Sequence, residues 1–334
     1  MKQLVETLFS GEDLSYEDAR LLFKQVFSDA MDHVNIAGIL IALKVKGETP
    51  TEIAALVQTL RDNAVKFPSP ESLSADSCGT GGDGLHTLNV STASAFVAAE
   101  CGLPMVKHGN RSVSSRSGSA DIIEALGIDL NASPEMSAGC LQSHGYSFLF
   151  APKYHPSMAT VGPVRQKLAT RSIFNLAGPL ANPAAPPVQL MGVYHPDLCQ
   201  TLAEALAQLG CNNAMVVHGS GLDEIALHGD THAVLLRDGK TEQMTIKPSD
   251  AGLETQPLKA IQLSESDDPL AIFLEVIKGR GTVAMTDIVA LNTGALLWTA
   301  GLFDSIREAT VVAKQAILDG AVAKKLADIQ EYYQ

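Results

Sequence analysis

The densest group of residues suited to chemistry is a glycine-rich turn at residues 79–84, with the sequence GTGGDG. Glycine has no Cβ atom, so its backbone reaches positive φ and approaches a ligand closely. Successive N–H groups in such a turn can converge on one anion. The turn therefore predicts a phosphate-binding loop, and the alternative is a flexible surface turn.

The same turn matches the dinucleotide-binding fingerprint through Gly79, Gly81 and Gly84. That fingerprint requires a preceding strand, and residues 71–77 do not read as an apolar strand. No Gly-Lys-Ser/Thr follows the turn, so a P-loop is excluded. The context thus disfavours a dinucleotide.

A helix start follows the turn. The sequence NVST at residues 89–92 leads into an alanine-rich run at 93–99, which ends at Gly-Leu-Pro at 102–104. Ser and Thr before such a run are N-cap signals, and Gly and Pro after it are stop signals. The free N–H groups of this helix would point at the anion in the turn. In the alternative interpretation, Ser91 only caps the helix.

A basic and serine-rich segment, KHGNRSVSSRSGS, occupies residues 107–119 and ends where Ser119 is expected to cap a helix running to Gly127. It holds three fixed cations and five hydroxyls in a chain of net charge −13. A basic island in an acidic protein predicts an anion site, although a solvated loop has the same composition. Lys and Arg would neutralise phosphate, and hydroxyls would complete its shell.

Two adjacent acids, Asp223 and Glu224, follow a candidate strand and the Gly-Ser-Gly of residues 219–221. Loops at strand ends commonly carry sites, and glycine lets both acids address one region. Mg²⁺ prefers hard oxygen ligands and accepts one or two carboxylates with substrate phosphates. From these residues alone, a metal site and a solvated acidic turn are equally open.

In this order and spacing, GTGGDG, NVST, KHGNRSVSS and GSAD resemble the anthranilate phosphoribosyltransferase family of tryptophan biosynthesis. The resemblance extends essentially from end to end. It continues through FAPKYH at 150–155, VR at 164–165, FN at 174–175 with GP at 178–179, GVY at 192–194 and GLDE at 221–224.

The resemblance implies transfer of the phosphoribosyl group of phosphoribosyl pyrophosphate (PRPP) to the amine of anthranilate, with Mg²⁺ as cofactor. The residues implied for PRPP are Gly79, Gly82, Asp83, Thr87, Asn89, Val90, Ser91, Thr92, Lys107, His108, Gly109, Asn110, Arg111, Ser112, Val113, Ser114, Ser115 and Ser119. Those implied for anthranilate are Gly79, Asn110, His155 and Arg165, and those for the metal are Ser91, Asp223 and Glu224.

Attack by an arylamine on the anomeric carbon needs positioning and charge neutralisation more than covalent help. We therefore expect no essential Ser or Cys nucleophile, and expect Lys107, Arg165 and the metal to stabilise the transition state and the leaving group. A bidentate guanidinium of Arg165 would suit the anthranilate carboxylate. The alternatives are a surface salt bridge for Arg165 and ordinary satisfied polar roles for His108 and His155.

The 334 residues, 46% hydrophobic and 18% charged, suffice for two domains with real cores. Helical periodicity over residues 1–66 and apolar runs at 146–150, 188–193 and 214–218 predict an α/β fold. We expect a small all-helical N-terminal domain and a larger α/β domain with a mostly parallel central sheet.

The predicted domain boundaries place residues 1–70 in a helical unit; the resemblance implies that about 165–185 pack on it and that it forms a dimer. Residues 74–160 and 188–334 would form the PRPP-binding α/β domain. The proline-rich segment 181–187 reads as a hinge between them. Residues 238–239 (Asp-Gly) predict a hairpin turn, and residues 284–299 a buried helix.

Five scattered cysteines without a CxxC pair argue against a disulfide framework or a zinc site. The N-terminus has no apolar run of signal or membrane-spanning length, which predicts a cytoplasmic protein without a membrane partner. The acidic balance weighs against a nucleic-acid partner. Two rival functions stay open, a pyrimidine nucleoside phosphorylase and a noncatalytic nucleic-acid-binding relative, as does association with anthranilate synthase.

Overall fold

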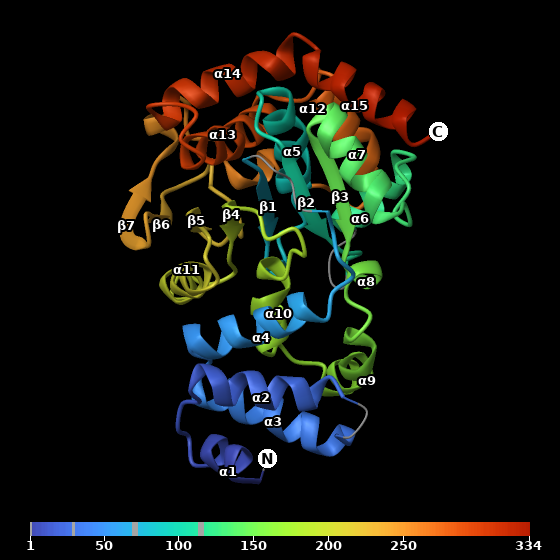
Figure 1. Cartoon of the computed structure of the whole chain (residues 1–334). Coiled ribbons are helices and arrows are strands. Elements are labelled where there is room, and N and C mark those ends of the chain that lie inside the picture. The colour runs from blue at the N-terminus through green and yellow to red at the C-terminus, as the bar shows by residue number, and fades with distance from the viewer. Residues whose placement is uncertain (1, 29–30, 69–72, 113–116) are drawn as a thin grey trace.

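The computed structural model describes residues 2–28, 31–68, 73–112 and 117–334. Val113, Ser114 and Ser115, predicted to bind PRPP, lie outside the described residues. The chain forms an N-terminal helical domain and a larger α/β domain, which confirms the predicted fold class (Figure 1).

The helical domain contains α1 (Lys2–Phe9), α2 (Tyr16–Val26), α3 (His33–Lys46) and α4 (Pro50–Asp62). A capping box starts α4, because the Glu52 N–H donates to Thr49 Oγ1 (3.2 Å) and the Thr49 N–H donates to Glu52 Oε2 (2.9 Å). Two later helices, α9 (Met158–Leu168) and α10 (Ile173–Ala177), pack on α3 and α4. The helical domain is thus completed by a distant part of the chain.

The sheet has seven strands in the order β3-β2-β1-β4-β5-β6-β7. Strands β1 to β5 pair in parallel, and β6 and β7 extend the sheet antiparallel, as predicted. The predicted hairpin joins β6 to β7, with φ of 51° at Asp238 and 72° at Gly239, the conformation of a type I′ turn. The strands are β1 (Ala75–Gly79), β2 (Met105–Gly109), β3 (Tyr146–Phe150), β4 (Val188–Gly192), β5 (Asn213–Gly219), β6 (Thr231–Arg237) and β7 (Lys240–Ile246).

Strand β1, with the sequence ADSCG, is a central strand despite its polar composition. The expectation that no strand precedes the glycine turn was therefore wrong. The Asp76 carboxylate is buried, yet it accepts hydrogen bonds from the His108 N–H (3.3 Å) and from Asn182 Nδ2 (2.9 Å). Because these partners are remote in sequence, hydrophobic patterning could not reveal the strand.

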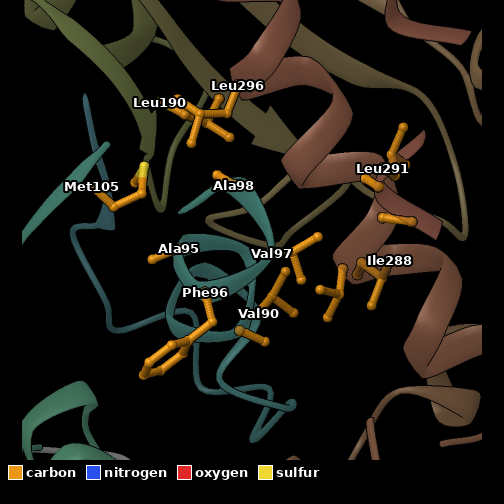
Figure 2. Close-up of a cluster of buried hydrophobic side chains, with 14 of the residues drawn as sticks. Val90, Ala95, Phe96, Val97, Ala98, Met105, Leu190, Ile288, Leu291 and Leu296 are labelled. Atoms are coloured by element: carbon orange, nitrogen blue, oxygen red, sulfur yellow. The ribbon is translucent and has the colours of Figure 1, made fainter. Parts of the chain in front are cut away.

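Each face of the sheet has its own core. On one face, Met215 and Val217 join a cluster in which α5 (Val90–Glu100) packs on the predicted buried helix α13 (Val283–Thr299), as Figure 2 shows. On the other face, Ala214 and Val216 join α11 (Leu198–Gln208) and the helical domain. The remaining helices are α6 (Ser119–Ala125), α7 (Pro134–His144), α8 (Ala151–Tyr154), α12 (Pro269–Ile277), α14 (Ile306–Leu318), α15 (Ala321–Tyr332), η1 (Gly178–Leu180), η2 (Pro248–Ala251) and η3 (Leu258–Ala260).

Candidate active site

The candidate active site lies where the parallel strands β1, β4 and β5 end, each on a glycine. A Cβ atom on Gly192 would lie 1.5 Å from the carbonyl oxygen of Asp223, and one on Gly79 would lie 2.4 Å from Asp223 Oδ2. A Cβ atom on Gly219 would lie 2.2 Å from the carbonyl oxygen of Glu224. The segment after β5 therefore folds back onto the strand ends, and the three glycines leave the space for it.

This segment carries both predicted acids to the glycine turn and to the start of α5. Asp223 Oδ2 accepts a hydrogen bond from the Gly81 N–H at 2.6 Å. Glu224 Oε1 accepts one from the Ser91 N–H at 3.1 Å. The two carboxylates thus address one region, as the sequence suggested.

Burial shifts the ionisation of both acids. It raises the pKa of the Asp223 carboxyl to about 7, and the negative charge of Asp83 contributes to the same shift. Burial also raises the pKa of the Glu224 carboxyl to about 8, with the charge of Asp223 as the next cause. The two adjacent carboxyl groups therefore do not readily ionise together. A bound cation would stabilise their charged forms.

A buried cation, Lys107, stands beside the acid pair. Its side chain is only 1% exposed, and Nζ donates to the Ser77 carbonyl oxygen and to Ser91 Oγ, the latter at 3.3 Å. The positive charge of Lys107 lowers the pKa of Glu224, against the effect of burial. The cluster therefore unites Ser91, Lys107, Asp223 and Glu224.

The donor set fits Mg²⁺ that is shared with a phosphate ligand. Asp223, Glu224 and the Ser91 hydroxyl supply hard oxygen atoms, and Mg²⁺ accepts one or two carboxylates with substrate oxygens and water. Across residues 2–28, 31–68, 73–112 and 117–334, no three His, Cys, Asp or Glu side chains form a metal-binding group. A metal here would need ligands from the substrate.

The start of α5 differs from the expectation. The N-cap residue is Asn89, whose side chain makes no capping bond, so Ser91 and Thr92 lie in the first turn rather than before it. The Asn89 Nδ2 group instead donates to the Ser117 carbonyl oxygen at 3.1 Å. Glu224 accepts from the Ser91 N–H, which a capping side chain would otherwise bind. The predicted cap role of Ser91 was therefore wrong.

Arg111 does not extend into the site as a free cation. Its guanidinium donates to Asp121 Oδ1 at 3.1 Å and to Glu124 Oε2 at 2.7 Å, both on α6. These acids lie ten and thirteen residues further along the chain. Among the described cations of the basic segment, only Lys107 lies in the acid cluster, so the local positive charge is smaller than the composition suggested.

Asp121 closes the base of the serine-rich loop, a role that the sequence analysis missed. Its Oδ2 atom accepts hydrogen bonds from the Ser112 N–H at 3.1 Å and the Gly118 N–H at 2.8 Å. Gly118 is the N-cap residue of α6, and Ser119 is the first helical residue, so the predicted Ser119 cap was wrong. An acid three residues after a helix start is the available signal for such an arrangement.

Arg171 fixes the glycine turn and was also missed. Its Nη2 atom donates to the Gly82 carbonyl oxygen at 2.5 Å, and its guanidinium lies 3.7 Å from the ring centroid of Tyr194. A peptide carbonyl and the next N–H point in opposite directions. Because Arg171 holds the Gly82 carbonyl, it also orients the Asp83 N–H.

His108 and His155 are buried and face each other, with ring centroids 5.2 Å apart. Burial lowers the pKa of His155 and holds the pKa of His108 well below its usual value. Both imidazoles are therefore neutral at neutral pH. They can act as hydrogen-bonding partners but not as cations for phosphate.

Arg165 lies on α9, half-buried, with its guanidinium 5.4 Å from the Phe174 ring centroid. Burial lowers its pKa, and no carboxylate of the described residues pairs with it. Asn110 is exposed, and its Oδ1 atom accepts from the Arg111 N–H at 2.7 Å. Neither Arg165 nor Asn110 contacts the acid cluster within the described part of the chain.

The remaining predicted residues flank the cluster. Asp83 Oδ1 accepts from the Leu85 N–H at 3.1 Å, within the glycine turn. Thr87 forms an isolated β-bridge with Gln262. Gly109 ends β2 where a Cβ atom would lie 2.2 Å from Ser119 Oγ.

The chain joins a helical domain to a mostly parallel sheet, with buried acids and a lysine at the strand ends, and this two-domain organisation matches that of glycosyl transferases. Two family models match the chain: "Glycosyl transferase family, helical bundle domain" over residues 2–64, and "Glycosyl transferase family, a/b domain" over residues 71–323.

Individual relatives narrow this class. An anthranilate phosphoribosyltransferase of Sorangium cellulosum is 48% identical, over 98% of this chain and 94% of the relative. The crystal structure of the Thermus thermophilus enzyme is 37% identical, with a TM-score of 0.93, covering 99% of both chains. The Saccharomyces cerevisiae enzyme, solved in complex with PRPP and Mg, is 26% identical, with a TM-score of 0.88 over 99% of this chain and 97% of that one. The chain belongs to the anthranilate phosphoribosyltransferase family.

None of the helices in the described part of the chain combines the length and the apolar character that crossing a membrane requires.

Proposed function

We propose that this protein transfers the phosphoribosyl group of PRPP to the amine of anthranilate, giving N-(5-phosphoribosyl)anthranilate and pyrophosphate. This reaction is the second step of tryptophan biosynthesis from chorismate. The observation that carries the proposal is the cluster of Ser91, Lys107, Asp223 and Glu224 at the strand ends. It joins hard metal ligands to a buried cation, as a metal-bound pyrophosphate requires.

Each part of the cluster has a role toward PRPP. Asp223, Glu224 and the Ser91 hydroxyl hold Mg²⁺, which supplies charge neutralisation on the pyrophosphate. Lys107 adds a fixed positive charge, and the N–H groups of residues 79–84 and of the first turn of α5 donate to phosphate oxygens. The other residues predicted for PRPP, including Val113, Ser114 and Ser115, complete its shell.

Anthranilate binds beside this cluster. Arg165 takes the carboxylate, because a half-buried guanidinium without an acid partner in the described chain favours a planar anion. Asn110 addresses the amine, while His155 and the backbone at Gly79 border the ring. Closure of the helical domain on the sheet, with residues 181–187 as hinge, brings the two substrates together.

The reaction then needs position and charge rather than a protein nucleophile. The amine nitrogen bonds to the anomeric carbon as the bond from that carbon to the pyrophosphate oxygen breaks, and the amine loses one proton. An arylamine is neutral near pH 7, so it needs little activation. Positioning of two bound substrates alone lowers such a barrier by roughly 7–11 kcal/mol.

The test mixes the purified protein with PRPP, Mg²⁺ and anthranilate and follows anthranilate fluorescence. The proposal predicts a loss of fluorescence that requires both PRPP and Mg²⁺. A folded protein that leaves the fluorescence unchanged would refute it. Phosphorolysis of pyrimidine nucleosides, assayed in parallel, would then identify the rival enzyme.

The helical domain supports the prediction of a homodimer. Phe9, Val34 and Val45 are 59%, 81% and 81% exposed. A groove of about 460 Å³ on α1 and α3 is lined by Leu8, Phe9, Gly11, Gly38, Ile41, Ala42, Val45 and Lys46. We propose that a second copy of the chain occupies this groove. Val45→Glu should therefore give monomers in sedimentation equilibrium. An unchanged mass would refute this interface.

The proposed cellular setting is the cytoplasm, with PRPP and anthranilate as the substrates. Association with anthranilate synthase remains open, and co-sedimentation of the two purified proteins is its test.

A further inference from the structure

The gap between β1 and β2 is the most unusual feature of the sheet. Strand β1 pairs with β4 at five positions, and β2 pairs with β3 at five, whereas β1 and β2 pair only at Ala75 and Met105. Beyond that pair no ladder pair joins the two strands, although they remain neighbours in the sheet. The loops that follow them are the glycine turn and the basic segment, which form the candidate PRPP site.

Side chains form hydrogen bonds with the backbone groups that a continued ladder between β1 and β2 would pair. Continued parallel pairing would join the Ser77 N–H to the Val106 carbonyl and the His108 N–H to the Ser77 carbonyl. Instead, the Val106 carbonyl accepts from Asn182 Nδ2 at 2.7 Å, and the His108 N–H donates to Asp76 Oδ1 at 3.3 Å. The Ser77 carbonyl accepts from Lys107 Nζ.

The side chains in the gap are buried and bonded to one another. Asp76, Lys107 and Asn182 are exposed by 0%, 1% and 1%. Asn182 Nδ2 also donates to Asp76 Oδ2 at 2.9 Å, and Asn182 Oδ1 accepts from the Ala184 N–H at 2.9 Å. Since both polar atoms of the Asn182 side chain have partners, the side chain is held in a single orientation.

We propose that Asp76 and Asn182 are positioning residues that hold β1 and β2 apart and so place the Lys107 ammonium group at the pyrophosphate. This inference rests on the proposed function. If the ladder continued, the strands would stay about 4.8 Å apart and the Lys107 side chain would project from a face of the sheet. With the strands apart, the Lys107 Nζ atom reaches the first turn of α5 and contacts Ser91 Oγ.

The connection that carries Asn182 also contacts the helical domain. Asn182 lies in the connection that returns from α10 to β4, and Arg61 of α4 donates to the carbonyl oxygen of Leu180 in that connection at 2.7 Å.

The test measures PRPP affinity by calorimetry in the presence of Mg²⁺, together with KM for each substrate. Asn182→Ala and Asp76→Ala should each weaken PRPP binding about tenfold, the usual effect of losing a hydrogen bond to a charged group. The KM for anthranilate should stay within about twofold. Because the two residues belong to one hydrogen-bond network, the double variant should be hardly weaker than either single variant.

Thr299→Val is the matched control. Thr299 is fully buried and donates to the Ala295 carbonyl oxygen at 2.8 Å, near the end of α13. It should lower stability without changing PRPP affinity, and its effect should add to that of Asn182→Ala.

Wild-type PRPP affinity in Asn182→Ala, or losses that multiply in the double variant, would overturn the proposal. If Asn182→Ala does not fold, Asp76→Asn retains the side-chain volume and is judged by the same affinity. A wild-type protein that neither binds PRPP nor consumes anthranilate would refute the proposed function instead, so the two failures are distinguishable.

Discussion

Replacing Gly192 with alanine tests whether the segment after β5 forms the metal end of the site. The new Cβ atom would lie 1.5 Å from the Asp223 carbonyl oxygen and 2.2 Å from the Asp223 carbonyl carbon. Ordinary contact begins at 3.4 Å, so the Asp223 backbone has to move by about 2 Å.

A displacement of this size should be costly for catalysis. A misplacement of about 1 Å can cost about a hundredfold in rate, so kcat/KM for PRPP should fall by a hundredfold or more, about 2.7 kcal/mol of transition-state stabilisation. The half-saturating Mg²⁺ concentration should rise. The fold should survive, since overpacking typically costs about 1–3 kcal/mol.

The assay is the initial rate of anthranilate fluorescence loss over a series of PRPP and Mg²⁺ concentrations, with thermal unfolding as the check on folding. Gly162→Ala is the control, because its Cβ atom meets nothing within 4 Å and it lies within α9. A Gly192→Ala protein with the wild-type rate and Mg²⁺ dependence would refute the placement of Asp223 and Glu224 in the site.

Three further predictions follow. Asp223→Asn with Glu224→Gln should abolish measurable turnover while the protein stays folded, and an unchanged Mg²⁺ dependence would contradict their role. Arg165→Ala should raise KM for anthranilate more than KM for PRPP; equal losses would indicate a structural arginine. Burial raises the pKa of the Asp76 carboxyl from 3.8 to about 6, so its contribution to stability is complete below pH 4 and is lost as the pH rises through 6. Chemical denaturation should therefore show the free energy of unfolding of Asp76→Asn, relative to wild type, rising by about 2 kcal/mol between pH 4 and pH 7, and a constant difference would contradict this burial effect.

Local signals in the sequence predicted much of the fold. The turn at residues 238–239 and the buried helix predicted over 284–299 depend on neighbours within a few positions. The glycine turn was found in the same way, with positive φ at Gly81, Gly82 and Gly84. Features of this kind can be predicted because the residues that determine them are adjacent in the sequence.

Features that depend on distant residues were not predictable. Strand β1 is polar, and its buried aspartate is bound by Asn182 and by the His108 N–H, which are distant in sequence. The helix start at Ser91 is bound by Glu224, 133 residues further along the chain. Arg171 reaches the Gly82 carbonyl across 89 residues. None of these contacts leaves a periodic or local pattern in the sequence.

The central claim is that one site joins PRPP to anthranilate, and the most direct measurement counts both products. Pyrophosphate release and N-(5-phosphoribosyl)anthranilate formation would be quantified together by chromatography and mass spectrometry, with Mg²⁺ present and absent. The account predicts equal amounts of the two products, formed only with Mg²⁺. Pyrophosphate released without the anthranilate adduct, or no reaction by a folded protein, would contradict it.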